Sequence, residues 1–193
     1  MKVPLTTRDH IERAALVYGD RIGVFDEPDQ EAPPLGDLTL LYGTTGWGRV
    51  AVPINFRLHP HEVQFIVDHS GAEILFIDPE LEESLAEVTA PQKYVIGSDT
   101  DELVHRFDIQ PTLWEPDEDA TATINYTSGT TARPKGVEMT HRNLWINAAT
   151  FGWQAAVTDR DVYLHTLPMF HCNGWGFPFT TAAVGVPQVV LRK

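Results

Sequence analysis

The residues between positions 127 and 136 combine small side chains, hydroxyl groups and one lysine. They read Thr127-Ser128-Gly129-Thr130-Thr131-Ala132-Arg133-Pro134-Lys135-Gly136. Such a run offers a polyphosphate four hydroxyl donors, backbone amides that small side chains leave accessible, and a compact positive charge. Each charge-assisted hydrogen bond contributes about 1.5–3 kcal/mol, so several together would hold a triphosphate. The run therefore predicts a phosphate-binding loop.

The order of residues within this loop differs from that of a Walker A motif. In a Walker A motif Gly-Lys-Ser/Thr ends the loop and opens a helix, whereas here Lys135 precedes Gly136 and Pro134 interrupts helix formation. A P-loop NTPase is disfavoured, also because no strand ends in an acidic residue in the Walker B manner. A Ser/Thr/Gly turn without a ligand is the structural alternative, and the length of the run favours the phosphate loop.

A second candidate for chemistry is the predicted loop 168–175, which contains His171 followed by Asn173-Gly174-Trp175. A single loop histidine is usually a hydrogen-bonded surface group, but the aromatic and small neighbours of His171 favour a site. Cys172, the only cysteine, is expected to line or pack the loop, because neighbours in an extended segment point to opposite faces. His59, His61 and His69 show no metal-ligand spacing with a nearby acid, so no metal site is predicted.

The elements that must position these loops alternate along the chain. A strand over Thr121–Tyr126 leads into the phosphate loop, and a helix over Arg142–Gln154, capped by Thr140, follows it. Leu40–Gly48 is read as irregular. The other expected elements are helices after Thr6 or Thr7 and over Pro60–Gly71, Glu80–Val88 and Phe177–Val184, and strands over Arg21–Phe25, Val50–Val52, Glu73–Ile77, Tyr94–Ile96, Val162–Leu167 and Gln188–Leu191. This alternation predicts an α/β fold with a mixed or parallel sheet and flanking helices.

The composition is that of an ordinary globular protein. Its 193 residues suffice for one domain, or one domain and part of another. A net charge of −13 argues against nucleic-acid binding, which needs clustered cations. The first ten residues have no apolar core of a signal peptide, and no segment predicts a membrane span. A single cysteine permits no internal disulfide, and we expect a cytoplasmic protein.

The phosphate loop, residues 126–137, resembles the signature loop of AMP-forming acyl-adenylating enzymes, which include acyl-CoA synthetases, luciferases and peptide-synthetase adenylation domains. Three further segments are similar to the fatty-acid and medium-chain CoA ligase branch: Val52–Leu58, His69–Ala72, and Pro168–His171 with Asn173–Trp175. The resemblance covers most of the chain and follows the order of the family's N-terminal domain. Residues 1–193 are therefore interpreted as a truncated N-terminal AMP-binding domain.

The resemblance implies a role for each matching residue. The β- and γ-phosphates of ATP would be held by Thr127, Ser128, Gly129, Thr130, Thr131 and Lys135. His171 would lie where the acyl carboxylate meets the α-phosphate, and His171, Asn173, Gly174 and Trp175 would bind the acyl substrate, with Trp175 as an aromatic gate. The implied ligase joins a carboxylic acid to AMP with ATP and Mg²⁺, then passes the acyl group to CoA. Trp175, Phe177 and Phe179 favour an apolar acid.

The chain also departs from the family pattern. Ala132 replaces a glycine of the loop, which costs roughly 1 kcal/mol if positive φ is required and predicts weaker ATP handling. Near residues 39–40 the family carries about 30 further residues or more, which implies either an internal deletion or a segment that this sequence omits. The family's adenine-stacking aromatic, magnesium-binding Glu, ribose-binding Asp and C-terminal lid with its lysine are not found.

We therefore expect that this chain alone does not form acyl-AMP at an appreciable rate. A domain that lacks part of its sheet is expected to be marginally stable or to need a homo-oligomer or a complementing chain. The alternative interpretation is a non-catalytic remnant that binds nucleotide or acyl groups, or a module that binds another protein.

Overall fold

The computed structural model describes residues 3–26, 37–97, 100, 102–103, 106, 108–110, 112–127 and 134–190. Its helices are α1 (Thr7–Tyr18), α2 (Asp37–Thr45), α3 (Pro60–Ser70), α5 (His141–Gln154), α6 (Cys172–Trp175) and α7 (Phe177–Val184), with a 3₁₀ turn η1 (Pro79–Leu81). Its strands are β1 (Val24–Asp26), β2 (Ile74–Ile77), β3 (Gln92–Val95), β4 (Thr121–Thr127), β5 (Lys135–Thr140), β6 (Tyr163–Leu164) and β7 (Gln188–Val190). Helices and strands are interleaved along the chain, although α3 follows α2 and α7 follows α6 with no strand between them.

The strands form parallel and antiparallel pairs within the described residues. β1, β7 and β6 make a parallel sheet with β7 in the middle, and β2 pairs with β3 in parallel. β4 and β5 form an antiparallel hairpin, and Ala51 adds a parallel bridge to Thr123 of β4. The predicted α/β fold class with a mixed or parallel sheet is confirmed.

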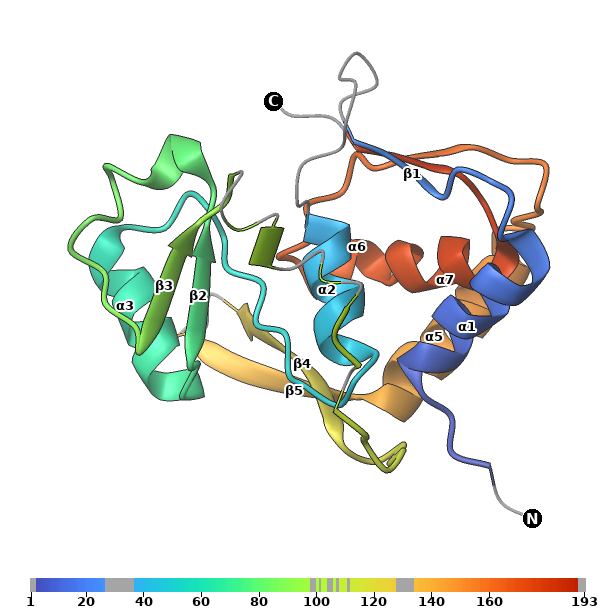
Figure 1. The fold of residues 1–193 in the computed structure, drawn as a ribbon, viewed down its shortest axis with the longest axis horizontal. Coiled ribbons are helices and arrows are strands. Elements are labelled where there is room, and N and C mark those ends of the chain that lie inside the picture. Colours follow the sequence, from blue (N-terminus) through green and yellow to red (C-terminus); the bar gives the residue numbers. More distant parts are fainter. Residues whose placement is uncertain are drawn as a thin grey trace.

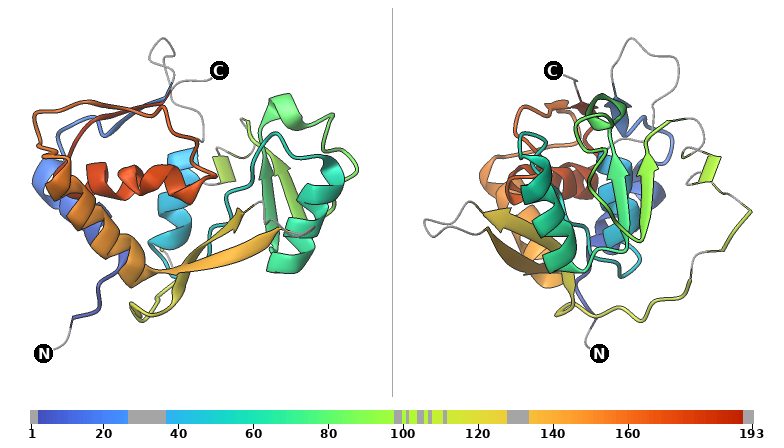
Figure 2. Two further views of the ribbon diagram at one scale, coloured as in Figure 1. Left: turned by 180° about the vertical axis from the view of Figure 1, so that it is seen from behind. Right: turned by 90° about the vertical axis from the view of Figure 1, so that its left-hand side faces the viewer.

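The elements gather around two apolar clusters. α3, β2 and β3 lie at one end of the molecule, and α1, α5 and α7 lie at the other, with α2 and the β4–β5 hairpin between them (Figures 1 and 2). The first cluster contains Val63, Val67, Leu75, Ile77, Leu85 and Val88. The second contains Leu41, Ala122, Leu144, Ala148 and Phe179. Ala122 lies in the second cluster, so the first residues of β4, the strand that leads to residue 127, are packed in the apolar core.

Two helices have the end signals that the sequence predicts. α3 begins with Pro60 and ends at Gly71, whose φ of 68° is a left-handed cap. α5 begins after Thr140, whose Oγ1 accepts a hydrogen bond of 3.2 Å from the backbone N–H of Asn143. Because Thr140 is also the last residue of β5, the hairpin and α5 are joined without a loop.

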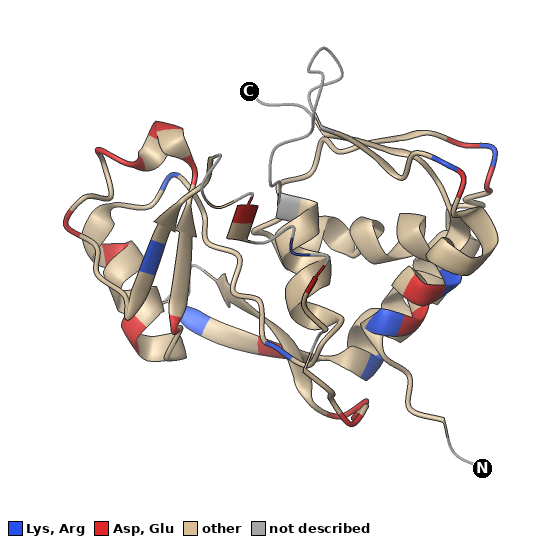
Figure 3. Cartoon of the chain, in the orientation of Figure 1, with Lys and Arg blue, Asp and Glu red and all other residues tan. Residues whose placement is uncertain are grey.

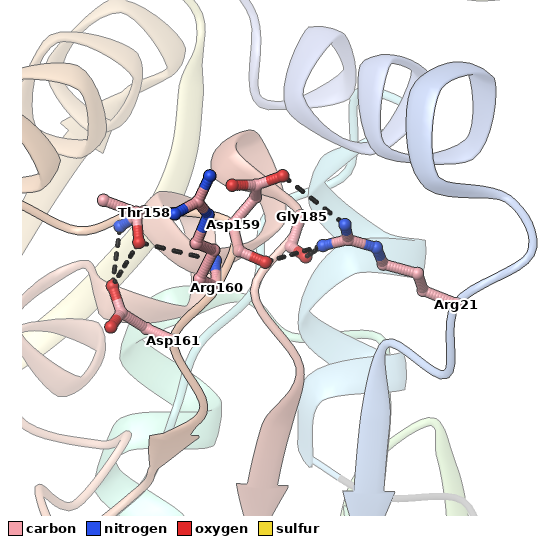
Figure 4. Close-up of polar contacts among 6 residues, drawn as sticks. All are labelled: Arg21, Thr158, Asp159, Arg160, Asp161 and Gly185. Atoms are coloured by element: carbon pink, nitrogen blue, oxygen red, sulfur yellow. Dashed lines mark hydrogen bonds and ion pairs between the residues drawn. The ribbon is translucent and has the colours of Figure 1, made fainter.

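An arginine joins the turn after α1 to the turn between α5 and β6 (Figure 4). The guanidinium of Arg21 donates to the backbone oxygen of Asp159 at 2.7 Å and lies 3.4 Å from its carboxylate. The same guanidinium lies over the ring of Tyr18 at 4.8 Å. Within its own turn Thr158 donates two hydrogen bonds to the Asp161 carboxylate, from its backbone N–H at 2.7 Å and from its hydroxyl at 3.0 Å. The contacts of Arg21 with Asp159 therefore connect the end of α1 to the turn that precedes β6 of the three-stranded sheet.

Charged residues are distributed over both ends of the molecule (Figure 3). On α1 basic and acidic side chains alternate, and Arg8 pairs with Glu12 at 2.6 Å. The exposed Arg142 of α5 pairs with the buried carboxylate of Glu118 at 3.0 Å. Among the helices that the structure describes, none is long and apolar enough to cross a membrane.

Some sequence predictions were wrong. Residues 80–88 form the short turn η1 and further turns instead of a helix, and their hydrogen bonds from Ala86 to Glu83 and from Val88 to Leu85 span three residues. Residues 37–45, read as partly irregular, form α2. Lys135–Thr140 is a strand that the sequence interpretation did not include.

Candidate functional site

The predicted phosphate loop is carried by the β4–β5 hairpin. In the antiparallel register Thr127, the last residue of β4, is opposite Lys135, the first residue of β5. Both residues are exposed. The predicted loop residues Ser128, Gly129, Thr130 and Thr131 lie outside the described residues. The hairpin thus brings a hydroxyl group and a lysine together at the end where β4 is connected to β5, a suitable pair for phosphate oxygens.

The hairpin is closely packed behind this pair. A Cβ atom added at Gly136 would lie 2.9 Å from Cγ2 of Ile124 and 3.2 Å from Cζ of Tyr126, so a side chain at Gly136 would collide. The phenol oxygen of Tyr126 lies 2.8 Å from Nδ1 of His69 on α3. Burial raises the pKa of Tyr126, which keeps its hydroxyl protonated and able to donate. Gly136 and Tyr126 therefore fix the end of β4 against β5 and α3.

The second candidate segment contains α6, whose residues have positive φ angles, so that it is a left-handed turn and not a regular helix. His171 has an extended φ of −104°, and the φ angles of Cys172, Asn173 and Trp175 are 49°, 51° and 61°. Two hydrogen bonds of 3.0 Å close the turn, from the N–H of Gly174 to the oxygen of His171 and from the N–H of Gly176 to the oxygen of Asn173. His171, Cys172 and Trp175 are exposed, and Asn173 is fully buried.

Aromatic rings accompany this turn. Trp175, which is 51% exposed, meets Phe151 edge to face at 6.2 Å. Phe151 contacts Phe177 at 5.5 Å, and Phe177 stacks on Tyr163 at 4.5 Å. Phe179, interpreted as a pocket residue, is instead fully buried in the second apolar cluster. An apolar surface next to the turn is thus made by Trp175, Phe151 and Phe177.

The structure brings the two candidate segments together through buried side chains that the sequence interpretation missed. Nδ2 of Asn125 on β4 donates to Oδ1 of Asn173 at 3.0 Å. Asn125 precedes Thr127 by two residues, about 7 Å along a strand, and Asn173 follows His171 by two residues. The signal in the sequence was the alternation of polar Thr121, Thr123 and Asn125 on β4, which we interpreted only as a strand.

Several predicted residues have other structural roles. Cys172 is exposed, with its Sγ 3.9 Å from Nε2 of His171, so its interpretation as a packing residue was wrong, whereas its interpretation as a residue that lines the loop stays a prediction. Gly174 is buried and has a φ of 57°. Within the described residues, no group of three or more His, Cys, Asp or Glu side chains could hold a metal ion. These residues do not supply a set of ligands for Mg²⁺, so we derive no step through it.

The chain matches the family model described as "AMP-binding enzyme" over residues 19–193. It is 35% identical to the 4-hydroxybutyrate–CoA ligase 2 of Metallosphaera sedula over 176 residues, which cover 81% of this chain and 32% of the relative. It is 31% identical over 254 residues to an Arabidopsis thaliana protein named "Probable acyl-activating enzyme 5, peroxisomal", covering 98% of this chain and 45% of the relative.

The fold is also similar to that of solved structures. The ATP-bound crystal structure of MatB from Rhodopseudomonas palustris matches with a TM-score of 0.68 and 26% identity, over 95% of this chain and 38% of that protein. The chain spans from about a third to a half of the length of these curated relatives.

Proposed function

The chain belongs to the AMP-binding enzyme family, and from that premise we propose that it is the part of an AMP-forming acid–CoA ligase that binds the phosphates of ATP and the acyl group. The pairing of Thr127 with Lys135, at the end of the hairpin where β4 is connected to β5, carries this proposal. In the complete enzyme a carboxylate oxygen would bond to the α-phosphorus of ATP, and the bond to pyrophosphate would break. CoA would then take the acyl group from acyl-AMP.

The proposed reaction joins two anions and so requires positive groups. Lys135 would neutralise the β- and γ-phosphates and stabilise the departing pyrophosphate, since charge grows on its oxygens as the bond breaks. The hydroxyl of Thr127 would donate to the same oxygens. Ser128, Gly129, Thr130 and Thr131 are proposed to complete this phosphate site. His171, on the turn that Asn125 ties to β4, would lie beside the acyl carboxylate.

The acyl substrate is proposed to be a fatty or other apolar carboxylic acid. The exposed face of Trp175 and its neighbours Phe151 and Phe177 would provide an apolar wall. Gly174, beside Trp175, is proposed to belong to the same acyl-binding turn, although its backbone is buried. Mg²⁺ and CoA are proposed as further requirements of the complete enzyme, and a cytoplasmic location stays a prediction.

An internal deletion near residues 39–40 is part of the proposal. Support comes from the Arabidopsis relative, whose alignment runs over 254 residues although this chain has 193. Residues 39 and 40 lie inside α2, between the buried Leu38 and Leu41. A continuous helix therefore spans the position where the relatives are expected to carry more residues. We propose that the chain alone is not competent to form acyl-AMP.

Calorimetric titration with ATP tests the phosphate site. We expect Lys135→Ala to weaken ATP binding roughly 10- to 100-fold, because a charge-assisted contact of about 1.5–3 kcal/mol is lost. Arg160→Ala is the matched control, since Arg160 is an exposed cation on the turn before β6 (Figure 4) and its removal changes the net charge equally. Equal weakening by both variants would indicate a general charge effect and refute the site.

The same titration separates the ligase from the alternative interpretation. Failure of the wild-type chain to bind ATP would favour a module that binds another protein, or a remnant that has lost nucleotide binding. Release of pyrophosphate on addition of fatty acids, ATP and Mg²⁺ would show that the chain is active alone, against our proposal.

A further inference from the structure

The turn that carries Trp175 consists of consecutive left-handed residues. Cys172, Asn173, Gly174, Trp175 and Gly176 have φ angles of 49°, 51°, 57°, 61° and 77°. A left-handed conformation costs a residue with a side chain roughly 1–2 kcal/mol, and three of these five residues are not glycine. Backbone strain of this kind persists only where surrounding contacts hold it, and it is concentrated at functional sites. Some contact must therefore hold this turn.

A closed ring of three hydrogen bonds supplies that contact. The hydroxyl of Thr123 donates to Oδ1 of Asn125 at 3.2 Å, Nδ2 of Asn125 donates to Oδ1 of Asn173 at 3.0 Å, and Nδ2 of Asn173 donates to Oγ1 of Thr123 at 3.0 Å. Each side chain is both donor and acceptor, so each bond polarises the next. The exposed fractions of Thr123 and Asn173 are 0%, and that of Asn125 is 5%.

The ring joins two elements that are far apart in the sequence. Thr123 and Asn125 belong to β4, whose last residue is Thr127. Asn173 lies in the turn, two residues from His171 on one side and two residues from Trp175 on the other. Because the ring is buried, removal of one member leaves two polar groups without partners, at a cost well above that of an exposed bond. The ring is therefore a stiff connection between β4 and the turn.

We propose that Asn173 is a positioning residue, which acts through Asn125 and Thr123 to hold the left-handed turn and to fix Trp175 relative to the end of β4. The role of this positioning in catalysis rests on the proposed function, in which Thr127 and Trp175 belong to one active site. The Asn173 side chain is fully buried, and both ends of its amide are used in the ring. It holds the residues beside it in place instead of touching the acyl group itself.

Fluorine NMR of protein labelled with 5-fluorotryptophan tests the connection without any ligand. The chain has five tryptophans, and Trp175→Phe identifies the Trp175 signal. We expect Asn125→Ala, a change on β4, to shift or broaden the Trp175 signal. Thr121→Val is the control, because Thr121 lies on the same strand and its hydroxyl bonds Glu138 outside the ring. An unchanged Trp175 signal in Asn125→Ala would overturn the proposal.

A glycine variant distinguishes the effect of the Asn173 amide group from the effect of the positive φ angle at residue 173. Asn173→Gly adopts positive φ without strain but lacks the amide. If the ring holds the turn, Asn173→Gly perturbs the Trp175 signal as Asn125→Ala does. If residue 173 only has to tolerate positive φ, Asn173→Gly leaves the signal as in the wild type, and the proposal fails. Urea unfolding of each variant at the NMR temperature confirms that the compared samples are folded.

Addition of ATP tests the purpose of the connection. We expect ATP to shift the Trp175 signal of the wild type, and we expect Asn173→Gly to bind ATP but lose at least about half of that shift. An equal shift in both proteins would overturn the coupling. If the wild type binds no ATP, the proposed function fails, while the ligand-free spectra still decide whether the ring positions Trp175.

Discussion

The phenol oxygen of Tyr126 lies 2.8 Å from Nδ1 of His69, and the two rings meet edge to face at 5.8 Å. Tyr126 is the neighbour of Thr127 on β4, and His69 is in the last turn of α3. The contact therefore joins the end of the hairpin to the helix that packs on β2 and β3. It is a direct link between one end of the molecule and the hairpin in its middle, next to the proposed phosphate site (Figure 1).

Tyr126→Phe tests this link. The variant keeps the ring over Gly136 and removes one hydrogen bond, so we expect the free energy of unfolding to fall by about 1 kcal/mol. Tyr94→Phe is the control, because its hydroxyl bonds Gln92 two residues away on the same strand and joins no two elements, so its loss is expected to cost less than about 0.5 kcal/mol. Urea unfolding followed by tryptophan fluorescence measures both values. Equal effects would contradict a structural role for the Tyr126 contact.

Acid is predicted to destabilise the fold through His10. Burial lowers its pKa to about 4, with a smaller opposing effect of Asp9. Its Nε2 is buried without a partner among the described residues, and its ring stacks on Trp145 at 5.4 Å. Because the unfolded chain takes up the proton near pH 6.5 and the folded chain does not, the stability present above pH 6.5 is lost as the pH falls toward 4.

His10→Phe tests this acid dependence. Phenylalanine keeps an aromatic ring against Trp145 and does not titrate. Between pH 7 and pH 5, we expect the loss of unfolding free energy in the variant to be about 2 kcal/mol smaller than in the wild type. Burial also lowers the pKa of His141, so part of the acid dependence remains. Identical pH profiles from urea unfolding would show that His10 does not carry the effect.

Lys93 is predicted to stabilise the irregular segment after η1. Its Nζ donates to the backbone oxygens of Leu85, Ala86 and Val88 at 2.8, 3.2 and 2.9 Å. We expect Lys93→Met to lower the free energy of unfolding by about 1–3 kcal/mol, since buried carbonyl groups lose a charged donor. Lys135→Met makes the same chemical change at an exposed lysine and should cost less than about 0.5 kcal/mol. A similar effect of the two changes would refute the proposed stabilisation of this segment by Lys93.

Three glycines form a graded test of backbone strain. Gly97 has no positive φ and no atom near an added Cβ, Gly71 has a φ of 68° and open space, and Gly185 has a φ of 76° with the Tyr18 ring where a Cβ would lie. We expect Gly97→Ala to be nearly neutral, Gly71→Ala to cost about 1 kcal/mol, and Gly185→Ala to cost at least about 2 kcal/mol. Thermal unfolding gives the order, and any other order contradicts the assignment.

The sequence predicted elements best where end signals and apolar periodicity agreed. Pro60 and Gly71 mark both ends of α3, and the structure confirms them. Residues 80–88 have an apolar pattern but four acidic residues within nine positions, and a helix that short needs tertiary packing to form. α2 was missed because its glycine and threonines have low helix propensity, which the burial of Leu38, Leu41 and Thr45 overrides.

The candidate site was predicted in part. The phosphate motif gave Thr127 and Lys135. β5 was missed because no element was assigned between Gly136, the end of the predicted loop, and the cap Thr140, although Val137 and Met139 alternate with polar residues. The Thr123–Asn125–Asn173 ring could not be predicted, because it joins residues 48 and 50 positions apart. Local patterns identify residues that can do chemistry, and only the folded chain shows which side chains hold them.

The parallel pairing of β1 with β7 has a consequence for synthesis of the protein. Residues 24–26 emerge early from the ribosome, whereas their partners, residues 188–190, emerge about 160 residues later. At 5–20 residues per second this delay is on the order of ten seconds or more. During that interval the N-terminal strand has an open edge, so we expect nascent chains to engage chaperones until translation of residues 188–190 is complete.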